Sequence, residues 1–349
     1  MRRTFLALAI GVAVCSLGAG QLRVDVALVN VVATVTDDRG RYVSDLRAED
    51  FILEEDGKRQ EIVHFSRANE LPVSVGIVLD TSASMERKIQ TATRAVDRFI
   101  RSIHPEDDIF LMTFDTSARV RQDFTSDRDK LTTALYKTRL GSGTALYEGL
   151  IAGLNKIKKG KHSKKAILLI SDGVDTTSEQ DFETALLATR ESEVLVYSLG
   201  IAPSGNSRSP MSERVPTRVP IPGQTGPTIP FPIPIPSPGR DRGPINIPLP
   251  GPGRRLVEPQ GVPQMDSIDM DVLDAFADAS GGNSWFITST SQIQDALDSI
   301  ADELRNQYTL AYYPGHNLKD GRWHRIEIRT RDSELNVRAK KEYFADDKK

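Results

Sequence analysis

The chain has 349 residues, a hydrophobic content of 39% and a formal net charge of −3 at pH 7. This length is enough for two domains of ordinary size, each with its own core. Acidic and basic residues are mixed along the chain, so the composition argues against a nucleic-acid-binding protein and against a protein that binds an anionic membrane surface.

The first 20 residues have the features of a secretory signal peptide. Arg2 and Arg3 precede an apolar run over residues 5–14, and small residues occupy positions 18–20. Because the apolar run is short for a bilayer span, an uncleaved anchor is the weaker alternative. We therefore expect cleavage near Gly20, no transmembrane segment after cleavage, and a secreted, periplasmic or cell-envelope location.

The cysteine content points to a bacterial protein. Cys15 is the only cysteine and lies inside the signal peptide. Lipidation at Cys15 is an alternative, although Val14 is bulkier than the residue that usually precedes a lipidated cysteine. Cleavage near Gly20 leaves a mature chain without disulfides, which is stabilised by its core. This composition is more typical of a bacterial envelope protein than of an animal extracellular protein.

Both ends of the chain are predicted to be β structure. Residues 21–70 contain short apolar segments separated by polar turns, and no helical periodicity. Residues 306–346 contain three alternating segments, at 308–313, 323–330 and 335–344. Neither region is long enough to close a β-sandwich by itself. We predict one β-sandwich with a half from each end; two separate β-modules are the alternative.

Residues 71–305 alternate strands and helices. Residues 166–170 are apolar throughout, and residues 73–79 are nearly all apolar, which is typical of strands buried on both faces of a parallel sheet. Further strands are predicted at 108–114, 119–124, 194–201 and 285–288. Helices are predicted at 87–103, 128–137, 147–157, 181–190 and 267–279. A last helix is predicted to carry Ile293, Leu297, Ile300 and Leu304 on one face. The pattern predicts an α/β fold: a doubly wound, mostly parallel sheet inserted in the β-sandwich.

A proline-rich insertion interrupts this domain at residues 203–263. It contains 17 of the chain's 20 prolines. Proline lacks the N–H group that a sheet ladder requires, so we expect extended polyproline II or disordered structure. The insertion is either a tolerated surface segment or a functional one, acting as a ligand arm or as a flap that screens the metal. Its arginines make it basic, which would favour an acidic partner.

Polar side chains follow the first apolar strand. Asp80, Ser82 and Ser84 form the pattern D-x-S-x-S directly after residues 73–79. Ligands of open α/β sheets bind at the carboxyl ends of strands. A carboxylate with two hydroxyls suits a hard divalent cation such as Mg²⁺. The alternative is that the two serines only cap the next helix.

Two later segments favour the metal site. Residues 140–150 place Thr144 in a glycine-rich turn ahead of a helix, and the strand at 166–170 leads to Asp172. Together the three segments resemble the von Willebrand factor type A domain and its metal-ion-dependent adhesion site. The pattern V-x-D-x-x-G-x-x-V-x-x-L in the N-terminal region, followed by D-F and E-D-G, also resembles secreted bacterial proteins related to that family.

The resemblance implies a specific ligand set. Ser82, Ser84 and Thr144 would contact the metal directly, and Asp80 and Asp172 would act largely through water. The metal would be Mg²⁺, with Mn²⁺ or Ca²⁺ as further options. An Asp or Glu carboxylate of a partner protein would fill the remaining coordination position. By contrast, Asp175 is expected to cap the turn after Asp172, and Glu148 to face solvent.

The predicted function is therefore metal-dependent protein binding, in adhesion or as a scaffold, without enzymatic activity. One alternative is a structural envelope protein that does not depend on metal. The other is a metal-assisted hydrolase, which would need a general base near the cation. The acids in that region are already assigned as ligands, so the hydrolase is the weaker of the two.

Overall fold

The computed structural model describes residues 28–67, 72–202, 269–315 and 320–345. The predicted signal peptide at residues 1–20, which includes Cys15, and the proline-rich insertion at 203–263 lie outside the described residues. Among the described helices, none combines the length and the apolar character needed to cross a membrane.

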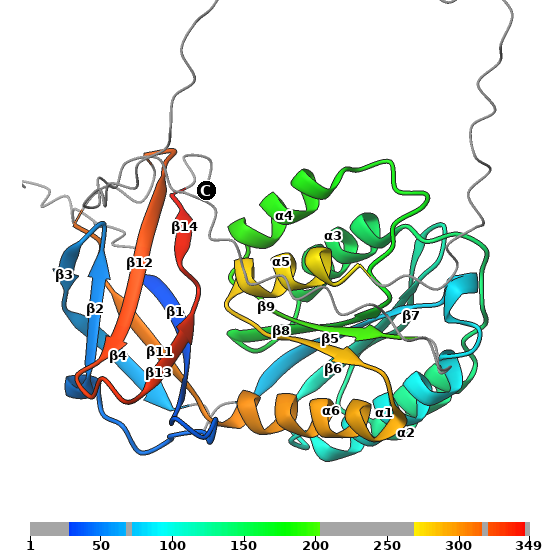
Figure 1. Ribbon diagram of the computed structural model, residues 1–349, viewed down its shortest axis with the longest axis horizontal. Helices are drawn as coiled ribbons and strands as arrows, with labels where there is room; N and C mark the ends of the chain where they lie inside the picture. Colours follow the sequence, from blue (N-terminus) through cyan, green and yellow to red (C-terminus); the bar gives the residue numbers. More distant parts are fainter. Residues whose placement is uncertain (1–27, 68–71, 203–268, 316–319, 346–349) are drawn as a thin grey trace, which may run out of the picture. The chain divides into compact units, whose positions relative to one another are not determined.

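The central sheet has the strand order β10-β9-β8-β5-β6-β7 (Figure 1). Its strands are β5 (Val73–Asp80), β6 (Asp108–Phe114), β7 (Ala118–Thr125), β8 (Lys164–Ser171), β9 (Leu195–Ile201) and β10 (Ser284–Ile287). Neighbouring strands are parallel except β6 and β7. Every residue of β5, β6 and β9 is buried, which explains why these segments carry no alternating polar positions. The predicted mostly parallel sheet is confirmed.

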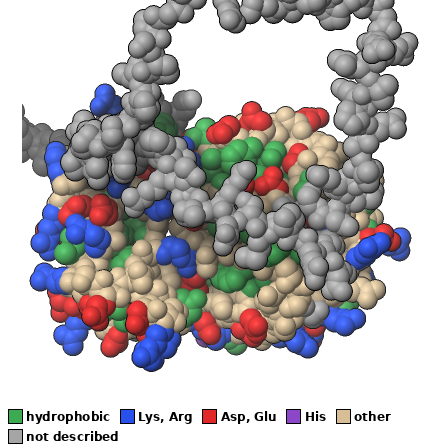
Figure 2. All heavy atoms as spheres, viewed as in Figure 1, with side chains coloured by type: hydrophobic (Ala, Val, Ile, Leu, Met, Phe, Trp, Pro, Cys, Tyr) green, Lys and Arg blue, Asp and Glu red, His purple; other side chains and the backbone are tan. Residues whose placement is uncertain are grey.

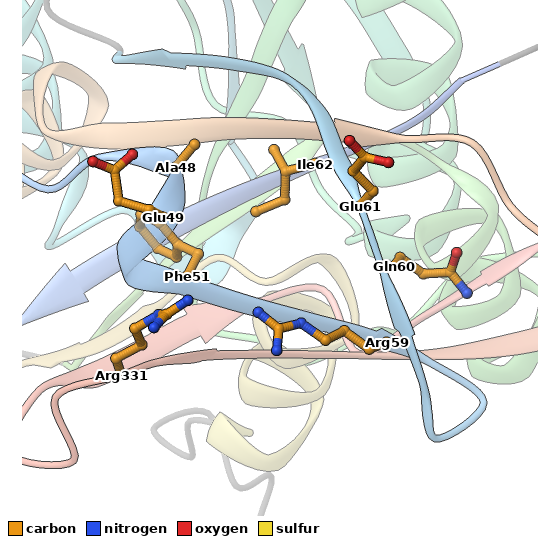
Figure 3. Close-up of a pocket in the computed structure, with 8 residues that line it drawn as sticks. All are labelled: Ala48, Glu49, Phe51, Arg59, Gln60, Glu61, Ile62 and Arg331. Atoms are coloured by element: carbon orange, nitrogen blue, oxygen red, sulfur yellow. The ribbon is translucent and has the colours of Figure 1, made fainter.

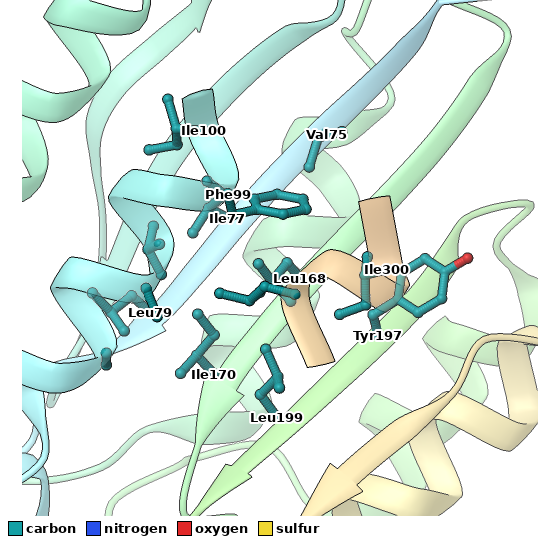
Figure 4. Close-up of a cluster of buried hydrophobic side chains, with 14 of the residues drawn as sticks. Val75, Ile77, Leu79, Phe99, Ile100, Leu168, Ile170, Tyr197, Leu199 and Ile300 are labelled. Carbon is teal, nitrogen blue, oxygen red and sulfur yellow. The ribbon is translucent and has the colours of Figure 1, made fainter. Parts of the chain in front are cut away.

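Helices cover both faces of this sheet (Figure 1). They are α1 (Ile89–Ser102), α2 (Arg128–Tyr136), α3 (Leu146–Ile157), α4 (Phe182–Glu191), α5 (Met270–Ser280) and α6 (Thr290–Arg305). One apolar cluster joins α1, α2 and α6 to β5 through residues such as Phe99, Ile300 and Ile77 (Figure 4). A second cluster joins α3, α4 and α5 to the opposite face, where Val78 lies. The alternation of Ile77 and Val78 between two helical layers buries both faces of β5.

Two antiparallel sheets are built from the ends of the chain. Their orders are β13-β1-β11-β4 and β14-β12-β2-β3. The strands are β1 (Val29–Thr36), β2 (Phe51–Glu55), β3 (Lys58–Gln60), β4 (Ile62–Arg67), β11 (Gln307–Tyr312), β12 (Trp323–Thr330), β13 (Asn336–Ala339) and β14 (Glu342–Phe344). Each sheet takes strands from both ends, and the sheets share one core in which Phe51 and Tyr308 meet edge to face. The sandwich made from both ends is confirmed, and two separate modules do not form.

One predicted strand is wrong. The segment at 335–344 was expected to be continuous, but it forms β13 and β14, which belong to different sheets. β13 pairs with β1 and β14 pairs with β12. A single strand cannot extend the edges of two sheets at once, so the ladder breaks at Lys340 and Lys341.

Candidate metal site at the strand ends

Two of the predicted ligands follow neighbouring parallel strands. Leu79 of β5 pairs in register with Ile170 of β8, so Asp80 and Ser171 come to the same edge of the sheet. The Ser171 hydroxyl donates to Asp80 Oδ2 at 2.7 Å. Asp172, the next residue, therefore lies at the same edge as Asp80, as the sequence predicts.

The Thr144 loop is attached to both of these strand ends. The Gly141 N–H donates to the Thr81 carbonyl at 2.7 Å, which joins this loop to the D-x-S-x-S loop. The Thr144 carbonyl accepts hydrogen bonds from the Thr176 and Thr177 N–H groups at 2.9 and 3.1 Å. Hydrogen bonds thus connect the three loops that carry all five predicted ligands.

Asp80 lies fully buried at the centre of this arrangement. Its Oδ1 accepts a hydrogen bond from the Ser82 N–H at 2.8 Å, and its Oδ2 accepts the bond from Ser171. Burial raises the pKa of Asp80 to about 6, and the charge of Asp172 acts in the same direction, whereas the bonds from Ser82 and Ser171 lower it. Two buried carboxylates at one edge make this a place where positive charge is favourable.

The two serines of the motif face each other. The hydroxyl oxygens of Ser82 and Ser84 lie 2.9 Å apart. Ser82 precedes the short 3₁₀ helix Ala83–Met85, but its side chain makes no capping hydrogen bond, and α1 begins only at Ile89. The alternative in which these serines serve only as helix caps is therefore not supported, because Ser82 makes no capping hydrogen bond and the N-cap residue of α1 is Lys88.

Asp172 meets a residue that the sequence patterns did not single out. Its Oδ2 lies 3.3 Å from the Lys88 ammonium, and its Oδ1 accepts a bond from the Val174 N–H at 3.3 Å. The side chains of Lys88 and Asp172 are 3% and 2% exposed. The sequence does indicate that Lys88 is buried: it precedes Ala92 and Val96 by four and eight residues, so it continues the buried face of α1.

Two acids expected to have minor roles connect the Thr144 loop to the Asp172 loop. Asp175 accepts a bond from the Ser178 N–H at 3.1 Å, as expected of a turn cap, but also one from the Leu146 N–H at 2.7 Å, at the start of α3. Glu148 was expected to face solvent; instead its Oε1 accepts bonds from the Glu179 and Gln180 N–H groups at 2.5 and 2.9 Å. Asp175 therefore binds the start of α3, and Glu148 of α3 binds the segment that follows Asp175.

Asp175→Ala is expected to lower the free energy of unfolding by about 1 to 2 kcal/mol, because the first turn of α3 loses a cap. It should also weaken cation binding, since α3 directly follows Thr144. Chemical denaturation and metal titration measure the two effects. Asp181→Ala is the matched control: Asp181 caps α4 through the Thr184 N–H at 2.8 Å, outside the three loops, and should lower stability without changing cation affinity.

The donor set fits a hard cation. It consists of two carboxylates and three hydroxyls, which are the oxygen ligands that Mg²⁺, Mn²⁺ and Ca²⁺ accept. Within the described ranges no group of three or more His, Cys, Asp or Glu side chains is placed to hold a metal ion, which leaves the strand-end site as the candidate there.

The described part of the chain also has a cavity outside the candidate metal site. A cavity of about 480 Å³ lies in the sandwich and contains none of the five predicted ligands (Figure 3). It is lined by Ala48, Glu49, Phe51, Arg59, Gln60, Glu61, Ile62 and Arg331. Figure 2 shows acidic and basic side chains interspersed over the coloured part of the visible face, in line with the small net charge of the chain.

The part of the chain that contains the candidate site is similar in sequence to known proteins. Residues 75–174 match the family model of the von Willebrand factor type A domain. An uncharacterized protein of Borreliella burgdorferi is 27% identical over 156 residues, which cover 42% of this chain and 44% of that protein, so the match spans less than half of the relative.

The chain is also similar to solved structures, among them the following two. An aerotolerance-related membrane protein from Bacteroides fragilis has a TM-score of 0.44 at 17% identity, over 66% of this chain and 99% of that chain. Proximal thread matrix protein 1 from the mussel byssus, with a zinc-occupied MIDAS motif, has a TM-score of 0.45 at 11% identity, over 70% and 48%. From β5 to the turn after β8, at residues 75–174, the chain thus has the sequence pattern of a von Willebrand factor type A domain.

Proposed function

We propose that the chain is an exported protein-binding module, acting in adhesion or as a scaffold, in which a divalent cation at the strand-end site binds a carboxylate of a partner protein. The observation that carries this proposal is the joining of three loops around Asp80 and Asp172, both buried. A carboxylate pair at that depth is costly unless positive charge accompanies it, and Lys88 compensates only one of the two negative charges.

The residues divide into two groups. The hydroxyls of Ser82, Ser84 and Thr144 would hold the cation directly. Both oxygens of Asp80 already accept hydrogen bonds from the protein, which suits a role through water. Mg²⁺ keeps several of its waters when bound to proteins, so a site with few direct charged ligands is appropriate for it; Mn²⁺ and Ca²⁺ are further options. The bound cation would supply the charge that attracts a carboxylate.

The contacts of the acidic side chains near the site favour a binding function over a catalytic one. A hydrolase would need a general base beside the cation. Among the described residues of the site, Asp172 contacts Lys88, whereas Asp175 and Glu148 accept backbone hydrogen bonds that hold the loops together. Each acid thus has a structural role. Export is inferred from the signal peptide that the sequence of residues 1–20 predicts.

The test is the effect of metal on stability. Mg²⁺ at about 100 times its dissociation constant is expected to add roughly 2.7 kcal/mol to the unfolding free energy of the wild type, measured by denaturation in Mg²⁺ and in chelator. Asp80→Ala should lose this gain because it removes one of the two carboxylates. Asp181→Ala should retain it.

If the wild type neither binds Mg²⁺ or Mn²⁺ in calorimetry nor gains stability from either ion, the proposal is wrong. A structural envelope protein that does not depend on metal would then be the better description.

A further inference from the structure

We propose that Lys88 sets the cation affinity of the strand-end site and makes retention of the cation depend on an anionic partner, because its ammonium group shares Asp172 with the cation. This inference rests on the proposed function, since it concerns the same site. It adds Lys88, which is outside the predicted ligand set. It also states that the affinity for the cation and the affinity for the partner carboxylate increase together.

The position of Lys88 is fixed by the backbone around it. Lys88 directly precedes α1; its N–H donates to the Met85 carbonyl at 2.8 Å, and its carbonyl accepts from the Ala92 N–H at 3.0 Å. The side chain leaves this fixed point and reaches Asp172 Oδ2, 3.3 Å away, with almost no exposure to solvent. Burial of an ammonium group is costly unless it meets a partner. Here the partner is a carboxylate of the candidate metal site.

The charges explain the consequence. Asp80 and Asp172 together contribute two negative charges, and Lys88 contributes one positive charge. A divalent cation would leave the site neutral without Lys88, but with a net charge of plus one in its presence. Excess positive charge in a buried site opposes the cation, since like charges a few ångströms apart repel strongly there. The same excess favours a carboxylate from outside, which would restore neutrality.

Two properties follow for the wild type. It should bind the cation weakly when no anion is present, and a carboxylate should increase its affinity for the cation. By linkage, the cation must increase the affinity for the carboxylate by the same factor. The cation and a partner with an exposed Asp or Glu would therefore each increase the affinity of the chain for the other.

The experiment is calorimetric titration of the full mature chain with MnCl₂, with and without 50 mM acetate at constant ionic strength. Lys88→Met is expected to bind Mn²⁺ at least about tenfold more tightly than the wild type without acetate. Arg87→Met is the matched control: it removes the same charge from the neighbouring, exposed position and should change the affinity less than twofold. Acetate should raise the Mn²⁺ affinity of the wild type more than that of Lys88→Met.

The outcomes distinguish a failure of the proposed role of Lys88 from a failure of the proposed function. Equal or weaker Mn²⁺ binding by Lys88→Met, with binding still abolished by Asp80→Ala, overturns the role of Lys88 and leaves the proposed function standing. Absence of Mn²⁺ binding in all variants and in the wild type overturns the proposed function. If Lys88→Met does not fold, Lys88→Gln is titrated in its place. If neither variant folds, the effect of acetate on the wild type decides: without any increase in Mn²⁺ affinity, the inference is wrong.

Discussion

Gly173→Ala is expected to lower the free energy of unfolding by about 3 kcal/mol and to abolish cation binding. Gly173 has a φ of +79°, in the left-handed region, where a side chain is strained. A Cβ atom there would also lie 2.2 Å from the Asp269 carbonyl oxygen, so the backbone would have to move. The movement would reach the site, because the Gly173 N–H donates to the Ser171 hydroxyl, which in turn donates to Asp80.

The control separates backbone strain from the steric clash. Gly40 has a φ of +75°, but an added Cβ would meet no atom within 4 Å. Gly40→Ala should therefore cost only about 1 kcal/mol and leave cation binding unchanged. Denaturation of both variants in chelator, followed by Mn²⁺ titration, makes the comparison. Equal losses in the two variants would show that the loop after β8 can relax, and that the contact with Asp269 does not hold Asp172 in place.

The sequence was most informative where one physical requirement determines the residue pattern. A strand covered by helices on both faces is apolar along most of its length, and β5 and β8 are therefore recognisable from residues 73–79 and 166–170 alone. The strand ends then place Asp80 and Asp172 at one edge. The antiparallel edge strand β7 was predicted within one residue at each end, because a break in apolar character precedes it.

The sequence was least informative where a side chain has a partner far along the chain. Asp175 and Glu148 cap each other's loops across about thirty residues, and nothing in the local pattern of either segment identifies the partner. Lys88 could be placed on the buried face of α1, but the acid that it meets is 84 positions away. The break between β13 and β14 likewise depends on which sheet edges are available, a property of the assembled fold.

Lys164 should make the stability of the protein rise with pH. It is the first residue of β8, 5% exposed, and its ammonium donates to the Leu304 carbonyl at 2.5 Å. Burial lowers the pKa of Lys164 to about 7, against the opposing effect of the charges on Glu303 and Asp107. Between pH 7 and the unfolded value near 10.5, the unfolded chain carries a proton that the folded protein has lost. Stability therefore increases across that interval, and the cost of burying the charge is present in full only below it.

The prediction is tested by the difference in unfolding free energy between the wild type and Lys164→Met. This difference should shift in favour of the wild type by about 4 kcal/mol from pH 7 to pH 10, at about 1.4 kcal/mol per pH unit. Chemical denaturation in chelator keeps cation binding out of the measurement. Lys165→Met is the matched control, because Lys165 is the adjacent lysine of β8, is only half-buried and donates to the His162 carbonyl at 2.6 Å. The pH dependence measured for this control is the baseline against which Lys164→Met is compared. A flat difference for Lys164→Met would show that the buried ammonium keeps its proton, and that the charges of Glu303 and Asp107 are enough to hold it.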